Sequence, residues 1–316
     1  MTIAWVVGSG GLLGSALCRV LPRTDTTLFT PAERFRWNSE RELAEQMAAA
    51  VKAFDSQLAN DDQWEIYWAA GVGTMSSAES ELAVETRALT TLIALVESHP
   101  RLVSKRGAFA FTSSAGAIYA GSQDDVITED TLPSPTTAYA REKLEQEKFV
   151  NQLALQSHVA ALVARVSTLY GPGQATGKQQ GLIAHISRCI LRNQLIQIYV
   201  PLDTIRDYIS ADDAAADIIA ALRSLETGVG ASTRIISSEQ PVTIAEIISI
   251  YKRISRRAPR IVTSASKLTS LYSKSIRFRS KRATVNKLAP RTSLLVGISQ
   301  MMNAERFAFM SNRNHP

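Results

Sequence analysis

The sequence is poor in cysteine, and this scarcity restricts both its chemistry and its setting. Only Cys18 and Cys189 occur among 316 residues, and both lie in apolar stretches typical of helices. So few cysteines argue against a disulfide scaffold or a cysteine metal site, and they are typical of a reducing compartment. We therefore expect two buried thiols, no metal site and a cytoplasmic protein.

Long apolar runs are also missing. None approaches the roughly 20 residues that a membrane span needs. The first ten residues, MTIAWVVGSG, lack the basic region that begins a signal peptide. The chain is 45% hydrophobic and 20% charged, which is ordinary for a globular protein and excludes a disordered chain or a fibre. We expect no membrane span.

Charge is distributed unevenly along the chain. Residues 251–316 hold 15 lysines and arginines but one acidic residue, Glu305, whereas the rest of the chain is net acidic. A basic quarter suits an anionic ligand, a membrane surface or nucleic acid, or is simply a solvated face. Within it, residues 274–282 are a candidate for holding a diphosphate. No aromatic-interleaved basic motif accompanies the charge, so we expect no nucleic-acid partner.

Apolar, β-branched runs alternate with amphipathic stretches along the first half of the chain. This order predicts a parallel sheet covered by helices on both faces, an α/β doubly wound fold of Rossmann type. We expect a dinucleotide-binding domain over 1–170 and a smaller, mainly substrate-binding lobe over 171–316, interleaved with the last core elements. The strands are expected at 3–7, 26–30, 65–68, 108–112 and 159–166, and the helices at 12–21, 40–54, 78–97 and 137–156.

A glycine-rich turn follows the first expected strand. Glycines at 8, 11 and 14 give the spacing G-x-x-G-x-x-G, immediately before a helix. The first allows a tight turn, the second lets the backbone approach a pyrophosphate, and the third lets helix pack on strand. The free N–H groups of the helix N-terminus favour phosphate. We assign the cofactor to Gly8, Gly10, Gly11, Leu12 and Gly14.

A second motif places Tyr139 and Lys143 four residues apart on an expected helix, so both side chains share one face. A free tyrosine has a pKa near 10, and a neighbouring cation lowers it by favouring the phenolate. Such a pair can exchange a proton with a sugar hydroxyl while hydride moves to a nicotinamide. The strand before this helix ends in Ser113 and Ser114, whose hydroxyls can bind a substrate carbonyl or cap a turn.

Together these features resemble the extended short-chain dehydrogenase/reductases, the NAD-dependent epimerase/dehydratase group that acts on nucleotide sugars. The resemblance runs nearly end to end. It is carried by residues 7–14, 67–71, 111–121, 138–143, 165–172, 206–212 and 286–297.

The resemblance implies roles for individual residues. Tyr139 becomes the acid/base, Lys143 its partner and a ribose ligand, and Ser114 the hydroxyl that orients the carbonyl, with Ser113 as the fallback. It also implies a homodimer formed through the Tyr–Lys helix and the helix before it. The remaining assignments are Thr30, Ala69, Ala70 and Gly71 to the cofactor, and Ser114, Thr168 and Arg206 to the nucleotide-sugar substrate.

Departures from the family pattern narrow the chemistry. Ala115 and Gly116 stand where dehydratases carry an Asp-Glu pair, and no cysteine follows Ser114 as in epimerase-reductases of the GDP-fucose type. Two reactions remain open: C4 epimerisation, and one-way reduction of a 4-keto sugar. A dinucleotide-binding regulator without turnover is the third alternative. In our alignment, Thr86 replaces the family's asparagine in the helix after Gly71.

The end of the second strand bears on the choice of cofactor. NAD-preferring members place a carboxylate there to hold the adenosine ribose. Here the strand ends at Thr30, and Arg34 and Arg36 follow. We therefore expect NAD(P) binding with NADP favoured over NAD.

Overall fold

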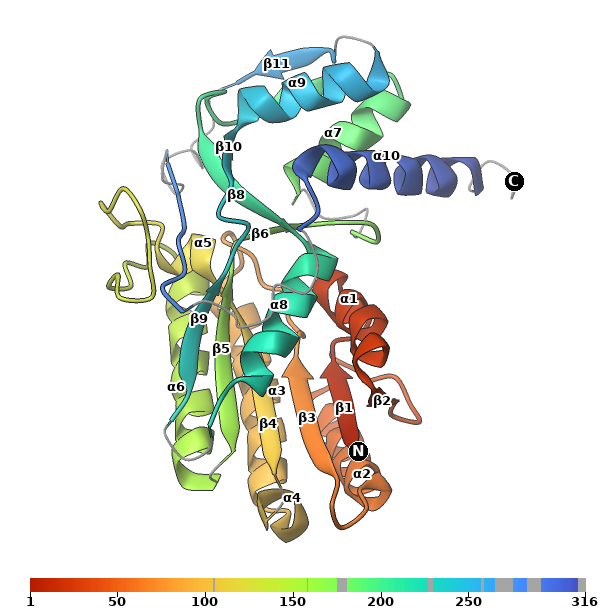
Figure 1. The fold of residues 1–316 in the computed structure, drawn as a ribbon, viewed down its shortest axis with the longest axis vertical. Coiled ribbons are helices and arrows are strands. Elements are labelled where there is room, and N and C mark those ends of the chain that lie inside the picture. The colour runs from red at the N-terminus through yellow and green to blue at the C-terminus, as the bar shows by residue number, and fades with distance from the viewer. Residues whose placement is uncertain are drawn as a thin grey trace.

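The computed structural model describes residues 1–104, 106–157, 159–174, 181–226, 230–256, 259–264, 275–282 and 291–311. The basic stretch 274–282 and the segment 286–297 that carries part of the family resemblance therefore lie partly outside the described residues. The chain forms a large α/β core with a smaller lobe at one end (Figure 1).

The first half of the chain builds most of the core. In chain order its elements are β1 (Thr2–Val7), α1 (Leu12–Val20), the 3-10 helix η1 (Leu21–Thr24), β2 (Thr26–Phe29), α2 (Glu40–Gln57), β3 (Gln63–Trp68), α3 (Glu79–Glu97), α4 (Pro100–Ser104), β4 (Gly107–Ser114), α5 (Ala115–Ile118), α6 (Ala138–Ser157) and β5 (Ala160–Val166). The five strands and four helices expected there begin and end within about three residues of the expected positions, whereas the short helices η1, α4 and α5 were not expected.

The second half contributes the lobe together with two further core elements. Its elements are β6 (Thr168–Tyr170), α7 (Leu182–Leu191), β7 (Ile196–Ile198), β8 (Ile205–Ser210), α8 (Ala211–Arg223), β9 (Ser232–Ile236), β10 (Pro241–Thr243), α9 (Ile244–Ser255), β11 (Ile261–Thr263) and α10 (Leu294–Ser311).

The core sheet has six strands in the order β2-β1-β3-β4-β5-β9, and every neighbouring pair is parallel. All seven residues of β5 are buried, as expected for a strand covered on both faces. The chain leaves β1 toward β2 and returns on the other side as β3. This reversal opens a crevice at the carboxyl ends of β1 and β3, where doubly wound sheets bind ligands. The fold is therefore Rossmann-like.

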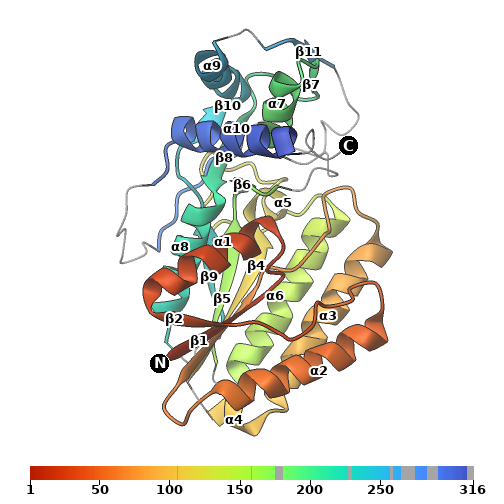
Figure 2. The ribbon, with the colours of Figure 1, turned by 90° about the vertical axis from the view of Figure 1, so that its right-hand side faces the viewer.

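Helices cover both faces of this sheet. Figure 2 shows α2, α3 and α6 on one face, and α1 and α8 on the other. Each layer has its own apolar core: Trp5, Phe54, Leu89 and Phe111 lie in the first, and Leu17, Tyr67 and Ile218 in the second. No helix within the described residues is long and apolar enough to cross a membrane.

The lobe sits above the carboxyl ends of the core strands (Figure 1). It contains the small sheets β10-β8-β6 and β11-β7, with α7, α9 and α10 packed around Ile186, Tyr251 and Met301. The chain passes between core and lobe over very short connections. Only Ser167 separates β5 from β6, and α8 begins directly where β8 ends.

The two cysteines are both free thiols. Cys189 is buried as expected, whereas Cys18 is only partly buried, because it lies on the flank of α1 rather than on the face that contacts the sheet. Burial raises the pKa of both thiols.

Candidate active site

The glycine turn joins β1 to α1 at the mouth of the crevice. Gly8 has a φ of +89°, which favours glycine, and a Cβ there would lie 2.6 Å from the Ala70 backbone at the end of β3. Gly11 precedes α1 without a side-chain cap, and Gly10 and Gly11 are exposed. The first N–H groups of a helix have no partner within it, so this turn fits a pyrophosphate.

Gly14 and Gly10 offer a matched pair of substitutions. A Cβ at Gly14 would overlap the Gly8 carbonyl oxygen, whereas a Cβ at Gly10 meets no atom within 4 Å. We expect Gly14→Ala to lower the free energy of unfolding by about 1–3 kcal/mol, the usual cost of overpacking. Gly10→Ala should change it by less than about 0.5 kcal/mol, as exposed substitutions do. Urea titration measures both, and equal costs would contradict the close packing at Gly14.

Ser114, Tyr139 and Lys143 meet where β4 ends and α6 begins. The Ser114 hydroxyl donates a hydrogen bond to Tyr139, although Ser114 stands at the N-cap position of α5, where its side chain makes no capping bond. The Lys143 Nζ lies 5.7 Å from the centre of the Tyr139 ring and 5.2 Å from that of Phe111. The structure thus brings together the three residues expected to do the chemistry.

Ser113, the fallback for Ser114, faces a different network. Its hydroxyl donates to Glu147 Oε1 over 2.6 Å, and Arg165 binds both oxygens of the same carboxylate at 3.0 and 2.6 Å. Arg165 also donates to the Tyr119 hydroxyl at 2.5 Å. The Ser113 hydroxyl is thus engaged by Glu147, whereas that of Ser114 is hydrogen-bonded to Tyr139. The geometry therefore favours Ser114 over Ser113 as the hydroxyl that faces Tyr139.

A carboxylate that the sequence analysis did not select, Glu85 on α3, completes this cluster. Its Oε2 lies 3.9 Å from Lys143 Nζ, and its Oε1 accepts hydrogen bonds from the amides of Val72 (2.5 Å) and Gly73. Its side chain is only 12% exposed. Glu85 therefore ties the loop after β3 to the Tyr–Lys helix.

Thr86, the residue that we align with the family's asparagine, lies beside Glu85 on α3. The Thr86 hydroxyl donates to Glu142 and accepts from Gln146, both on α6. Neighbouring helix residues point about 100° apart, so the Glu85 carboxylate approaches Lys143 while the Thr86 hydroxyl contacts Glu142 and Gln146. Leu82, Leu89 and Leu92 are buried on the helix face that Glu85 shares. An acidic residue on an apolar stripe was the signal that could have identified it.

The electrostatics of the cluster keep Tyr139 protonated in the structure as described. Burial and the charge of Glu85 raise the pKa of Tyr139 to about 12, against the lowering effect of the Ser114 hydrogen bond. Burial lowers the pKa of Lys143, and the carboxylates of Glu85 and Glu147 oppose that shift. Lys143 Nζ also donates to Gln146 Oε1 over 2.9 Å.

Thr168 and Arg206, which we assign to the substrate together with Ser114, lie on the small sheet of the lobe. Thr168 on β6 pairs with Tyr208 on β8, and Arg206 lies two residues before Tyr208. Both are partly buried, and the Arg206 guanidinium donates to its neighbour's carbonyl, Ile205 O. Asp207 faces inward instead and accepts hydrogen bonds from Ser167 and Ser238. It fixes the end of β8 rather than the substrate.

The adenosine end of the expected cofactor site lies beyond β2. Thr30 is exposed there, as is Arg34. Arg36 is held by Glu42 at 2.5 Å, and Gln46 binds Glu33 and the backbone of residue 34. Ala69, Ala70 and Gly71 follow β3, which lies on the other side of β1 from β2. The backbone of Ala70 lies close to Gly8 of the glycine turn.

A glycine turn at the switch point of a Rossmann-like sheet, next to a serine, tyrosine and lysine cluster, defines a class of dinucleotide-binding α/β proteins. A model of the NAD dependent epimerase/dehydratase family matches residues 4–235. The chain belongs to this family.

Curated relatives match parts of the chain. The dTDP-L-rhamnose 4-epimerase of Burkholderia thailandensis is 32% identical over 114 residues, 34% of this chain and 31% of that protein. The dTDP-4-dehydro-6-deoxyglucose reductase of Escherichia coli is 28% identical over 149 residues, 47% of this chain and 46% of that protein. The matched stretches therefore span less than half the length of these relatives.

Solved structures match nearly the whole chain at low sequence identity. RMD from Pseudomonas aeruginosa complexed with NADPH has 20% identity and a TM-score of 0.78. The Thermus thermophilus UDP-glucose 4-epimerase complex with NAD has 17% identity and a TM-score of 0.77. Each match covers 98% of this chain and 100% of the other. These similarities establish the fold.

Proposed function

We propose that the chain is an NAD(P)-dependent enzyme that moves hydride at a carbon of a nucleotide sugar, C4 in our assignment. The observation that carries this proposal is the cluster of Ser114, Tyr139 and Lys143 at the end of β4. This cluster and the glycine turn both lie at the carboxyl ends of the core strands, and therefore at the same edge of the sheet. A bound nicotinamide would accept hydride from the sugar carbon and return it.

The protein's own residues then have distinct tasks. As the phenolate, Tyr139 takes the proton of the sugar hydroxyl while that carbon is oxidised, and as the phenol it gives the proton back on reduction. Ser114, already hydrogen-bonded to Tyr139, orients the resulting carbonyl oxygen. The Lys143 ammonium favours the tyrosine's charged form and binds a ribose hydroxyl. Neither Ala115 nor Gly116 offers an acid or base for eliminating water, which disfavours dehydration.

The lobe is proposed to hold the nucleotide part of the substrate. Arg206 suits a phosphate because its forked guanidinium can bind two oxygens at once. Thr168 is the proposed second contact. The names of the matched relatives, a dTDP-sugar epimerase and a dTDP-sugar reductase, support a nucleotide sugar as the substrate class.

One-way reduction of a 4-keto nucleotide sugar is the alternative reaction. It needs the same three residues, and the name of the Escherichia coli relative supports it. We propose NADP as the favoured cofactor, because Thr30 replaces a carboxylate at the end of β2 and Arg34 is exposed beside it. Arg36 contributes less to this argument, since Glu42 already holds it.

The test begins with the dinucleotide that accompanies the purified protein. Tightly retained NAD would favour an epimerase that recycles its cofactor, and UDP- and dTDP-sugars would be screened for epimerisation. An empty site that binds NADPH better than NADH would favour the reductase, to be tested with keto sugars by nicotinamide absorbance. A protein that binds neither dinucleotide would overturn the proposal.

Glu85 gives this proposal a pH-dependent signature. Glu85→Gln removes a negative charge that raises the pKa of Tyr139 and of Lys143. Both groups should then lose their protons at lower pH, so the alkaline transition of kcat against pH should move to lower pH. Glu145→Gln is the control, because that exposed carboxylate pairs with Lys148. The same transition in wild type and Glu85→Gln would contradict the assigned role of Glu85.

A homodimer through α3 and α6 also remains a proposal. The outward side of α6 carries the exposed charged residues Arg141, Glu145 and Lys148, so such a contact would be polar. Sedimentation at two salt concentrations tests it, because an interface of this kind should weaken as salt screens the charges.

A further inference from the structure

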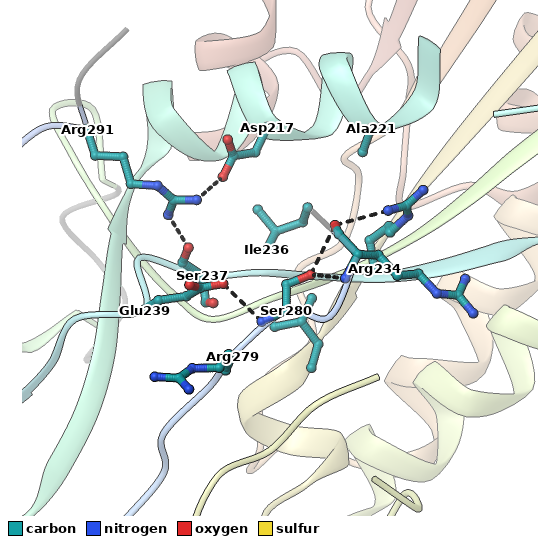
Figure 3. Close-up of a pocket in the computed structure, with 11 residues that line it drawn as sticks. Asp217, Ala221, Arg234, Ile236, Ser237, Glu239, Arg279, Ser280 and Arg291 are labelled. Atoms are coloured by element: carbon teal, nitrogen blue, oxygen red, sulfur yellow. Dashed lines mark hydrogen bonds and ion pairs between the residues drawn. The ribbon is translucent and has the colours of Figure 1, made fainter. Parts of the chain in front are cut away.

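A cavity of about 280 Å³ lies away from the Tyr139 cluster, between α8, the edge strand β9 and the segment 279–282 (Figure 3). It is on the face of the sheet that α8 covers, whereas Tyr139 and Lys143 belong to α6 on the opposite face. None of the residues that we assign to the cofactor or the sugar lines it. The cavity is therefore separate from the candidate active site.

Arginine dominates the lining of this cavity. Four arginines from three separate segments line it: Arg234 from β9, the exposed Arg279 and Arg282 from the 279–282 segment, and Arg291 from just before α10. Two carboxylates accompany them, and both are already engaged. Asp217 binds Arg291 at 2.9 Å, and Glu239 accepts the amide of Ser280 at 2.9 Å. The lining thus carries more positive than negative charge.

Arg234, which is partly buried, and Arg282, which is exposed, make hydrogen bonds but no ion pair with a described residue. Arg234 donates to the backbone carbonyl of Arg282 at 3.0 Å, and Arg282 donates to the Ser232 hydroxyl at 3.1 Å. Within the described part of the chain, neither has a carboxylate within ion-pair distance. Burial and the neighbouring charge of Arg282 lower the pKa of Arg234, with Glu129 only partly offsetting them.

Two polar atoms in the lining also lack partners among the described residues. They are Nε of Arg234 and Oγ of Ser237, and Ser237 is 2% exposed. A buried donor without a partner is costly, and native structures rarely keep one without a reason. An anion with several acceptor oxygens beside Arg234 would satisfy its Nε and offset the excess positive charge of the lining.

We propose that this cavity is a binding site for a phosphate group, as inorganic phosphate or as the phosphate of a small ester. Arginine suits such a ligand because its planar, always charged fork matches phosphate oxygens. The volume leaves room for more than one phosphate, which is why an ester remains a source to be tested. The 279–282 segment forms one wall of the cavity. Glu129 accepts hydrogen bonds from Ser280 Oγ and the Lys281 amide and so holds this segment against β9.

Isothermal titration of the full-length protein with inorganic phosphate tests the proposal, in chloride buffer matched for ionic strength. Wild type should bind, and Arg234→Gln and Arg282→Gln should each bind at least about tenfold more weakly, the loss expected on removing one charge-assisted hydrogen bond. Lys281→Gln is the matched control, since Lys281 is an exposed residue of the same segment that pairs with Asp130. A parallel titration with glycerol 3-phosphate distinguishes the sources: the tighter ligand identifies free phosphate or an ester.

Two further readouts keep the test decisive. Arg206→Gln should retain phosphate binding, because Arg206 belongs to the candidate active site. Arg234→Gln should unfold at the same temperature as wild type or higher without phosphate, because it removes a partly buried charge beside a like charge, and phosphate should no longer raise that temperature. Absence of binding in wild type, unchanged binding in both cavity variants, or loss of binding in Arg206→Gln alone would overturn the proposal.

Discussion

Tyr139→Phe is expected to lower turnover by about a hundredfold to ten-thousandfold, the range that general acid–base catalysis contributes. The substitution removes only the hydroxyl that exchanges a proton with the sugar. Lys143 keeps its contacts with Phe111 and Gln146, and the backbone of Ser114 stays paired with Val166 of β5, although the Ser114 hydroxyl loses its bond to Tyr139. Dinucleotide affinity should therefore stay nearly unchanged while kcat collapses. Steady-state kinetics and a fluorescence titration with NADPH measure the two quantities.

Tyr208→Phe provides the matched control. Tyr208 is also buried, and burial raises its pKa to about 12 as well. It lacks the serine and the lysine that accompany Tyr139, so its hydroxyl should contribute little to turnover. Equal losses in the two variants would argue that Tyr139 acts only through packing. Full turnover in Tyr139→Phe would remove it as the acid/base. A protein with intact dinucleotide binding and no turnover on any sugar would favour the regulator.

Arg165→Leu is expected to lower the free energy of unfolding by about 3–5 kcal/mol, the usual cost of removing one partner of a buried ion pair. The side chains of Arg165 and Glu147 are 9% and 10% exposed. Without Arg165, the Glu147 carboxylate keeps only the Ser113 hydroxyl as a partner, deep between β5 and α6. Urea unfolding at neutral pH measures the loss.

The expected loss depends on the charge left behind, and a double variant tests that cause. Replacing both Arg165 and Glu147 by leucine should recover much of the stability, because no uncompensated charge remains buried. Lys148→Leu, which breaks the exposed pair with Glu145, should cost no more than about 1 kcal/mol. A cost for Arg165→Leu that is no larger than that of Lys148→Leu would show that the buried pair is not important for stability.

Local patterns in the sequence were sufficient to predict the core. The apolar run before Gly8 predicted β1, and the spacing of the glycines predicted both the turn at Gly8 and the close packing at Gly14. The alternation of strands and helices predicted a parallel sheet, and each strand of the first half appeared near its expected place. The i, i+4 spacing of Tyr139 and Lys143 likewise placed both on one face of α6.

Features that depend on helix phase or on distant contacts were not predicted. Glu85 was not selected from the sequence, because its contacts with Lys143 and with the amides after β3 depend on how α3 packs against α6 and the loop. The arginines of the cavity stand up to 57 positions apart in the chain. Only folding brings Arg234 on β9 and Arg291 to the same cavity. Composition indicated that residues 251–316 could hold an anion, but not which four side chains would converge.

A single residue, Ser167, joins β5 to β6, and this short connection limits how far the lobe can move relative to the core. The Ser167 amide donates to Ile236 O, and its hydroxyl donates to Asp207, so the crossing is held from two sides. A swing of the lobe would have to break these bonds together with the direct passage from β8 into α8. We therefore expect substrate preference to depend on the side chains that line the site, rather than on a change in the angle between core and lobe. Cutting the chain near residue 170 would not release a self-sufficient half, because β5 would lose β9, its neighbour at the edge of the sheet.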